Sequence, residues 1–227
     1  MDRLAVIKIL MKQKKLRNYL EIGVFNGHIF FRIRSNFKIA VDPDFQFDFL
    51  RKAGKIVLNH YNLYNQYFEE TSDDFFKNNA ATALKGKKIE ISLIDGMHEY
   101  AYVLRDIENT LEYLSDDGVI VVHDCNALTA EAGSSYEEWS AKKIAGTWNG
   151  DVWKAIIHLR SLRNDIDVFV LDCDQGLGII TKRKPVKMLP FSEKEISKLT
   201  FSDFNANRES WLNLQPEGYL KEYFNLK

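Results

Sequence analysis

The chain has 227 residues, of which 45% are hydrophobic and 28% charged, as is ordinary for a protein that forms its own core. Its 31 basic and 32 acidic side chains give a formal charge of −1, which excludes the strongly basic character of a general nucleic-acid binder. The two cysteines, Cys125 and Cys173, are too few for a disulfide framework and lack metal-ligand spacing. We therefore expect a reducing, cytoplasmic location.

The first fifteen residues predict an amphipathic helix and not a signal peptide. Leu4, Ile7, Leu10 and Met11 recur at helical spacing, and Lys8 interrupts the apolar run. The lysines that follow are interpreted as a solvated helix face. No stretch of the chain approaches the ~20 apolar residues that span a bilayer, so we expect no membrane partner.

The most informative stretch begins at residue 19. An apolar run contains Glu21 near its end, and Gly23 and Gly27 follow four residues apart. A second apolar run ends in Asp42, about twenty residues after Glu21. This layout predicts a strand, a tight turn, a helix and a second strand whose acid contacts ribose hydroxyls. We expect a nucleoside-containing cofactor at the tips of these two strands.

The first half of the chain alternates strand and helix patterns. Short apolar or β-branched runs that end near Gly, Asp or Asn predict strands over 19–23, 38–42, 65–69, 89–95 and 118–123. The intervening segments predict helices over about 27–35, 44–53, 72–80 and 99–114. Strands separated by helices indicate a parallel sheet that is covered on both sides.

The second half of the chain predicts a different end to this sheet. The apolar runs 167–171 and 177–181 are separated by five residues, too few for a helix, so they form a hairpin and one strand is antiparallel. We predict an α/β, Rossmann-like three-layer sandwich with seven mostly parallel strands and a reversed last strand. Residues 1–227 form a single domain in this prediction, with an insertion or lid over about 125–165 and a helical tail over about 183–227.

Seven motifs in this order resemble the class I S-adenosylmethionine-dependent methyltransferases. The resemblance is to a group of small bacterial methyltransferases and, more distantly, to catechol O-methyltransferase, and it runs from about residue 18 to 182. The motifs are Glu21-Ile22-Gly23, Gly27, Val41-Asp42-Pro43, Ser72-Asp73-Asp74-Phe75-Phe76, Ile94-Asp95-Gly96-Met97-His98-Glu99-Tyr100, Asp106 and Val122-His123-Asp124. Each motif alone is a weak signal, and their common order makes a strong one.

The resemblance implies which residues hold the methyl donor, S-adenosylmethionine. The turn after the first strand and the acid of the second would hold most of it, and two residues after the third strand would face the adenine. These residues are Glu21, Gly23, Phe25, Gly27, Asp42, Ser72 and Asp73. An alternative for Ser72 is that it caps the helix that follows. The turn itself could also be an ordinary strand–turn–helix connection.

The resemblance also implies the catalytic residues. Asp95 ends the fourth strand, and His98 stands three positions later, where the catechol-type enzymes have a basic residue that deprotonates the hydroxyl. An imidazole with an ordinary pKa near 6.5 accepts a proton at neutral pH. His98 as a helix cap or packing residue is the alternative. His123 at the end of the fifth strand is a second candidate for the base.

A divalent cation such as Mg²⁺ on Asp95 and Asp124 is a further implication of the resemblance. The catechol-type enzymes have an Asp-Asn pair after the fifth strand, whereas here Cys125 follows the acid and Asn126 comes one position later. The alternatives are a metal-free acid–base pair of His123 with Asp124, or direct contact of these residues with substrate.

The function predicted from these residues is methyl transfer from S-adenosylmethionine to a hydroxyl of a small molecule or sugar. A nicotinamide-dependent oxidoreductase is one alternative, although Phe25 stands where a dinucleotide fingerprint has its middle glycine. A module that binds the donor without catalysis is another. The neutral charge makes a nucleic-acid substrate unexpected. The oligomeric state stays open, with a homodimer among the alternatives.

Overall fold

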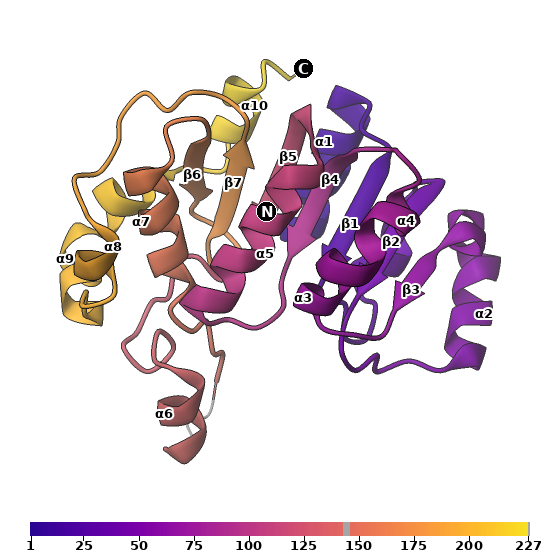
Figure 1. Ribbon diagram of the computed structural model, residues 1–227, viewed down its shortest axis with the longest axis horizontal. Helices are drawn as coiled ribbons and strands as arrows, with labels where there is room; N and C mark the ends of the chain where they lie inside the picture. The colour runs from indigo at the N-terminus through magenta and orange to yellow at the C-terminus, as the bar shows by residue number, and fades with distance from the viewer. Residues whose placement is uncertain (143–145, 227) are drawn as a thin grey trace.

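The computed structural model describes residues 1–142 and 146–226, which build a central eight-stranded sheet with helices on both faces (Figure 1). The strand order is β3-β2-β1-β4-β5-β7-β6-β8. The bounds are β1 Asn18–Ile22, β2 Phe37–Val41, β3 Gln66–Phe68, β4 Ile89–Ile94, β5 Leu114–Val122, β6 Asp167–Leu171, β7 Leu177–Thr181 and β8 Leu214–Gln215. Strands β1 to β5 are parallel, and β7 pairs antiparallel with both β5 and β6.

The α/β fold class and the reversed C-terminal strand predicted from the sequence are confirmed. The central strands are buried along nearly their whole length because helices cover both of their faces. The predicted number of seven strands needs one correction. The two-residue strand β8 comes from the C-terminal tail and adds a parallel pair to the edge strand β6. A two-residue segment has too little pattern to be recognised in the sequence.

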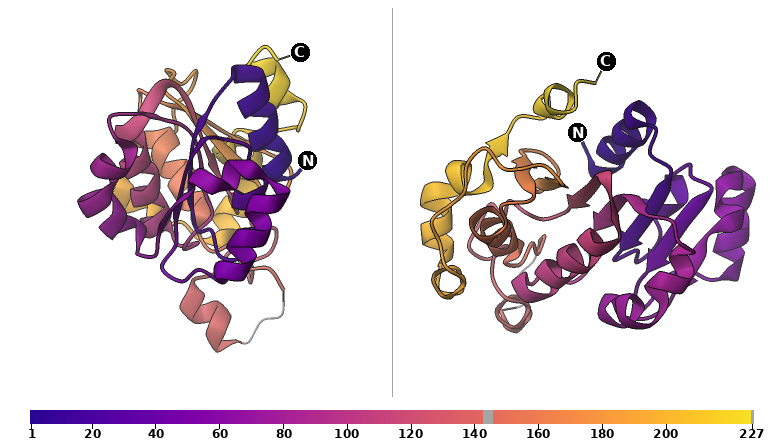
Figure 2. Two further views of the ribbon diagram at one scale, coloured as in Figure 1. Left: turned by 90° about the vertical axis from the view of Figure 1, so that its right-hand side faces the viewer. Right: turned by 45° about the horizontal axis from the view of Figure 1, so that its top comes forward.

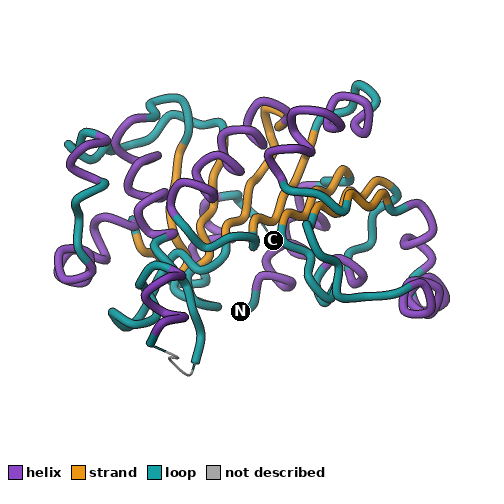
Figure 3. Tube along the Cα trace, turned by 60° about the horizontal axis from the view of Figure 1, so that its bottom comes forward, coloured by secondary structure: helices purple, strands orange, loops and turns teal. Residues whose placement is uncertain are grey.

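One face of the sheet packs against the larger group of helices. These are α3 Ser72–Asp74, the π-turn η3 Phe75–Asn79, α4 Ala80–Leu84, α5 Tyr100–Tyr113, α7 Val152–Leu162, α8 Glu193–Ile196 and α9 Phe201–Leu212. Helix α7 is buried along most of its length, whereas α6 Tyr136–Ala141, from the earlier part of the predicted insertion, lies outside the layers (Figures 1 and 3). The C-terminal tail packs back onto this layer, with Trp153 stacked on Phe204 at 4.6 Å.

The opposite face of the sheet is covered by the two ends of the chain. Helices α1 Arg3–Lys14 and α10 Tyr219–Tyr223 share one apolar cluster with this face, and Figure 2 shows them side by side. The amphipathic helix predicted at the N-terminus is therefore confirmed, with Leu4, Ile7 and Leu10 buried. Within the described ranges, none of the helices combines the length and hydrophobicity that a bilayer-crossing segment needs.

The predicted helix over 27–35 is wrong, because only the 3-10 turn η1 Phe30–Arg32 forms there. Its apolar side chains do not line one helical face, since Phe30, Phe31 and Ile33 are all buried. Helix α1 already packs on this part of the sheet, so the segment fills the space beside it. The next helix, α2 Phe49–Leu58, starts later than predicted because the Asp48 carboxylate caps it by accepting from Arg51 N.

Candidate functional site

The turn after β1 requires a glycine at its first position. Gly23 has φ +80°, and a Cβ on it would lie 2.1 Å from the backbone oxygen of Asp95. Phe25, two residues on, also has a positive φ of 48°, which is unusual for an aromatic residue. The Asp42 carboxylate fastens this turn, because Oδ2 accepts from Phe25 N at 2.7 Å and Oδ1 from Asp44 N at 2.8 Å.

The turn forms one wall of a cavity of about 840 Å³ at the carboxyl ends of the strands. The cavity brings together eight of the residues predicted for the site, namely Glu21, Gly23, Phe25, Asp42, Ser72, Asp73, Asp95 and His98. Gly27 is not among its lining residues. A Cβ on Gly27 would come within 2.3 Å of the Phe31 ring, so this glycine serves the packing of the turn.

The cavity is acidic. Five carboxyl groups line it against one arginine, Arg3, and the acids are Glu21, Asp42, Asp73, Asp95 and Asp106. Burial raises the pKa of Glu21 to about 8, although the hydroxyl of Tyr19 donates to its carboxylate. Burial also raises the pKa of Asp106 to about 7. A ligand that carries positive charge would stabilise the ionised form of both carboxyl groups and so lower their pKa values.

The residues predicted at the adenine end have partners of their own. Ser72 begins α3, and the cap of that helix is Thr71, whose hydroxyl accepts from Asp74 N at 3.1 Å. Asp73 pairs with Arg105 at 3.0 Å on the surface. Both Ser72 and Asp73 line the cavity, while their contact with a ligand stays a prediction.

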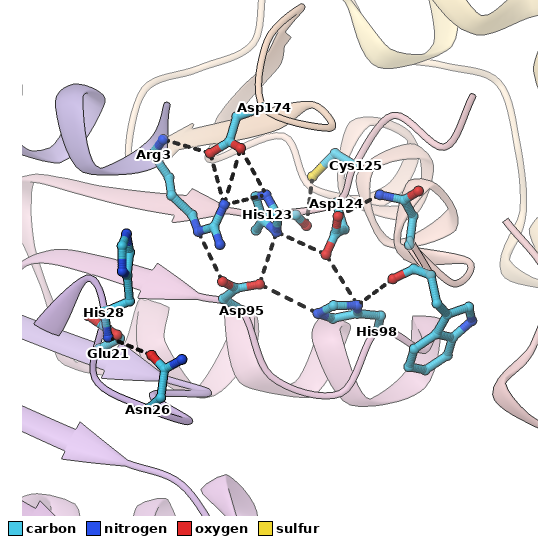
Figure 4. Close-up of polar contacts among 12 residues, drawn as sticks. Arg3, Glu21, Asn26, His28, Asp95, His98, His123, Asp124, Cys125 and Asp174 are labelled. Atoms are coloured by element: carbon cyan, nitrogen blue, oxygen red, sulfur yellow. Dashed lines mark hydrogen bonds and ion pairs between the residues drawn. The ribbon is translucent and has the colours of Figure 1, made fainter. Parts of the chain in front are cut away.

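The ends of β4 and β5 bring the candidate catalytic residues into one cluster (Figure 4). The ring nitrogen Nδ1 of His123 lies 3.0 Å from Asp95 Oδ1 and 2.9 Å from Asp124 Oδ2. His98 Nε2 is 3.5 Å from Asp95 Oδ1, and His98 Nδ1 is 3.2 Å from Asp124 Oδ2. Burial alone would raise the pKa of Asp95, but the hydrogen bonds from both histidines outweigh it and hold that pKa far below its ordinary value.

Two charged residues that the sequence analysis did not select complete the cluster. Arg3, at the start of α1, places Nε 3.1 Å from Asp95 Oδ2 and Nη1 2.9 Å from His123 Nε2. Asp174, in the turn between β6 and β7, lies 3.0 Å from Arg3 Nη1. The carboxylates of Asp124, Asp174 and Asp95 raise the pKa of His123 to about 11 in spite of its burial. The contact with Arg3 opposes them, because a guanidinium only donates and favours an Nε2 that accepts, with the ring proton on Nδ1.

Of the two candidate bases, His98 lines the cavity, whereas His123 is not among its lining residues. The Nδ1 atom of His98 lies 3.0 Å from the backbone oxygen of Trp148, and the two rings stack at 5.3 Å. A proton on Nδ1 would satisfy both this carbonyl and Asp124, and a second proton gained on Nε2 would face Asp95 Oδ1 at 3.5 Å. Burial lowers the pKa of His98, but Asp95 and Asp124 outweigh it, so the pKa is raised above its ordinary value.

The donor set does not fit the predicted metal well. Asp95, His98 and Asp124 each offer a ligand atom within 4.8 Å of the others. However, all four carboxylate oxygens of Asp95 and Asp124 already face N–H groups, from His123, Arg3 and the Asn149 side chain. The guanidinium of Arg3 would also repel a second cation beside Asp95. The metal on Asp95 and Asp124 therefore stays an untested prediction, and no step below passes through it.

Three residues of the site come from segments that the sequence patterns could not connect. Arg3 and His123 are 120 positions apart, and Asn149 reaches Asp124 from 25 positions away. Asp174 was visible only as part of a turn. Both Asp124 and Asp174 have positive φ, of 61° and 46°, and backbone strain of this kind gathers at functional sites.

With the geometry in place, comparison with known proteins places the chain. Residues 20–125 match the model of a family described as a methyltransferase domain. The match spans 106 of the 227 residues, just under half of the chain, so it shows a likeness to this family over that stretch. The resemblance to class I S-adenosylmethionine-dependent methyltransferases predicted from the motifs is confirmed. A search of the curated proteins gave no match.

Several solved structures share the fold of this chain at low sequence identity. The O-methyltransferase TomG of Streptomyces achromogenes is 11% identical, with 80% of this chain and 79% of that chain covered and a TM-score of 0.59. The O-methyltransferase of Bacillus cereus is 12% identical, with coverages of 79% and 80% and a TM-score of 0.55. The methyltransferase PaMTH1 of Podospora anserina is 16% identical, with coverages of 81% and 80% and a TM-score of 0.52. At these identities the likeness concerns the fold.

Proposed function

We propose that this protein transfers a methyl group from S-adenosylmethionine to a hydroxyl oxygen of a small molecule or sugar. The acidic cavity beside the glycine turn carries the proposal, because S-adenosylmethionine is a nucleoside with two positive groups, a sulfonium and an ammonium. Three of the structures with this fold support it, since TomG was solved with S-adenosylmethionine, and the Bacillus cereus and Podospora anserina enzymes with S-adenosylhomocysteine.

The residues present fit this cofactor. Glu21 is buried, and its raised pKa marks a carboxyl group that would ionise more readily beside an ammonium. Asp42 keeps lone pairs free for a ribose diol, since each of its oxygens accepts one backbone N–H. Gly23 lets the turn pack directly against the backbone of Asp95 at the cavity wall. When bound, the cofactor supplies an electrophilic methyl carbon on sulfur.

His98 acts as the general base in this proposal. Its Nδ1–H is held by the Trp148 carbonyl and Asp124, so Nε2 is available to take the proton of the substrate hydroxyl. The substrate oxygen bonds to the methyl carbon as the carbon–sulfur bond breaks, and the proton stays on His98 until solvent removes it. His123 and Arg3 hold Asp95 and thereby position His98.

The charge of the cavity also separates this proposal from a nicotinamide-dependent oxidoreductase. A dinucleotide carries an anionic pyrophosphate, which needs close backbone N–H groups and an electropositive helix N-terminus. Here Phe25 stands in the turn, only the short η1 follows it, and five acids line the cavity. A pyrophosphate would be repelled from such a cavity.

A wall of aromatic rings beside His98 supports an acceptor that has a flat face, such as a sugar or an aromatic ring. Trp148 lies 5.1 Å from Tyr136 and 6.2 Å from Trp139, and it stacks on His98. Tyr136 is about half exposed and could contact an acceptor directly. Trp153, by contrast, is buried against Phe204 and belongs to the core.

Calorimetric titration with S-adenosylhomocysteine tests the cofactor assignment. We expect micromolar binding that Asp42→Ala abolishes, whereas Asp44→Ala, on an exposed acid two residues away, preserves it. Equal affinities in the two variants would remove Asp42 from the site, and binding of a nicotinamide dinucleotide in place of S-adenosylhomocysteine would contradict the proposal. Methyl transfer from labelled S-adenosylmethionine to a panel of hydroxylated sugars and phenols then separates an enzyme from a module that only binds.

A further inference from the structure

A second cavity, remote from the acidic one, lies between α1, α2 and the segment after η1, with a volume of about 920 Å³. We call it the basic groove, because seven lysine and arginine side chains and no acidic ones line it. The chain as a whole has a net charge of −1, so this concentration of one sign is local. Helix α1 and the residues after it contribute Lys8, Lys12, Lys15 and Arg17.

Lysines near the end of α1 are explained in part by the negative end of its helix dipole. The dipole of α1 does not explain Arg32 and Arg34, which follow β1, or Lys55 on α2, because these residues lie outside that helix. Arg32 donates to the neutral partner His28 at 3.0 Å. Within the described part of the chain, none of the seven side chains pairs with a carboxylate, whereas Arg3, Arg105 and Arg163 all do. The groove therefore presents uncompensated positive charge.

The helix beside the groove turns its apolar side to solvent. Leu50, Val57 and Leu58 share one face of α2 and are 75%, 86% and 79% exposed. Gly54 lies between them on that face, and a Cβ on it would meet nothing within 4 Å. The inner side of the helix is held by Lys52, whose Nζ lies 4.4 Å above the Tyr67 ring. Exposure of the apolar side of a helix to water is unfavourable in free energy, so this orientation indicates that a partner covers the helix.

The apolar face and the basic groove form one continuous surface. Leu58 belongs to both, since it ends the apolar face and lines the groove together with Lys55. In Figure 2 (left), the edge that carries α2 faces the viewer and α1 lies beside it. Basic residues bordering an exposed apolar helix face are the combination that binds at the headgroup level of anionic bilayers.

We propose that this surface binds an anionic phospholipid membrane, with lipid phosphates in the basic groove and the outer side of α2 among the acyl chains. Charge complementarity selects this occupant over a second copy of the chain, because a two-fold contact through the same surface would oppose two basic grooves. The expectation of no membrane partner rested on the lack of a spanning segment, which binding at the surface does not need.

Vesicle sedimentation tests the proposal with phosphatidylcholine vesicles that contain or lack phosphatidylglycerol. We expect the unmodified protein to bind only the anionic vesicles, with an affinity that falls as salt rises. Arg32→Glu with Arg34→Glu should weaken binding at least about tenfold, whereas Lys184→Glu with Lys187→Glu, the same charge change on exposed lysines elsewhere, should not. Leu50→Ser with Val57→Ser should also weaken it about tenfold, and Val186→Ser, on a fully exposed valine elsewhere, should not.

Several results would overturn the proposal. If the unmodified protein binds both vesicle types equally, the proposal is wrong. It is also wrong if the control variants lose binding as much as the groove and helix variants do. Binding of inorganic polyphosphate without binding to vesicles would assign the groove to a soluble polyanion. A different outcome is that the protein binds no vesicles and forms a dimer in light scattering. If Leu50→Ser with Val57→Ser dissociates that dimer, the surface belongs to a second copy of the chain. Titration with S-adenosylhomocysteine and thermal unfolding show whether each variant is folded.

Discussion

Arg3 Nη1 lies 2.9 Å from His123 Nε2, so the first turn of the chain reaches the end of the fifth strand of the sheet. The same guanidinium contacts Asp95 and Asp174, and it is the only arginine or lysine that lines the acidic cavity as described. Burial lowers the pKa of Arg3, but these carboxylates outweigh it and raise the pKa above its ordinary value, so the group is always charged. A residue of the N-terminal helix thereby contributes a permanent positive charge to the candidate catalytic cluster.

Arg3→Met should lower kcat by about one to two orders of magnitude, because it leaves Asp95 and Asp174 without their cation and frees His123 to take a second proton. Affinity for S-adenosylhomocysteine should change much less, since Glu21 and Asp42 are untouched. Steady-state kinetics and calorimetry measure the two effects. Lys8→Met, on the same helix but in the basic groove, is the matched control. Equal losses of turnover and affinity would show that Arg3 has no separate catalytic effect.

The pH dependence of turnover distinguishes the two histidines. A general base must be neutral, and Asp95 and Asp124 raise the pKa of His98 above 6.5 in spite of its burial. The rate should therefore increase with pH through a pKa above that of a free histidine. His98→Gln should remove most of the activity and also this rising limb of the pH–rate profile. His123→Gln should lower activity but keep the limb, and the reverse pattern would make His123 the base.

Removal of divalent cations should leave activity unchanged. The carboxylate oxygens of Asp95 and Asp124 already face N–H groups from His123, Arg3 and Asn149, which supply the positive charge that a cation would bring. Assays after dialysis against a chelator, with and without added Mg²⁺ or Mn²⁺, measure this directly. A loss of turnover that Mg²⁺ restores would show that the cation displaces these contacts, as the resemblance to catechol-type enzymes implied.

Glu21 should make the folded protein less stable as the pH rises. Its folded pKa of about 8 exceeds the ordinary value of 4.5, so between these values the native state holds a proton that the unfolded state has released. The stability contribution is complete below pH 4.5 and is lost as the pH rises toward 8. Between pH 5.5 and 8, the free energy of unfolding measured in urea should fall by at most about 3 kcal/mol more in the unmodified protein than in Glu21→Gln. Parallel pH profiles of the two proteins would contradict this.

The sequence predicted the central strands well because they are buried on both faces and contain short apolar runs. It also predicted the reversed hairpin, since five residues cannot hold a helix. The helix over 27–35 was predicted wrongly because no local pattern reveals that α1 already covers that side of the sheet. Arg3 was missed for a related reason: its partners lie 92 or more positions away, and only the folded chain brings them together.

A matched pair of glycine substitutions separates conformational from steric effects. At Gly23, a methyl group would lie 2.1 Å from the backbone of Asp95 and the residue has φ +80°, so Gly23→Ala should destabilise the protein by several kcal/mol and abolish binding of S-adenosylhomocysteine. Gly54 sits in α2 with open space around its Cβ position, so Gly54→Ala should raise stability by about 0.5–1 kcal/mol and leave binding unchanged. Chemical denaturation and calorimetry measure both variants. If Gly23→Ala bound S-adenosylhomocysteine normally, the turn after β1 would not be part of the cofactor-binding site.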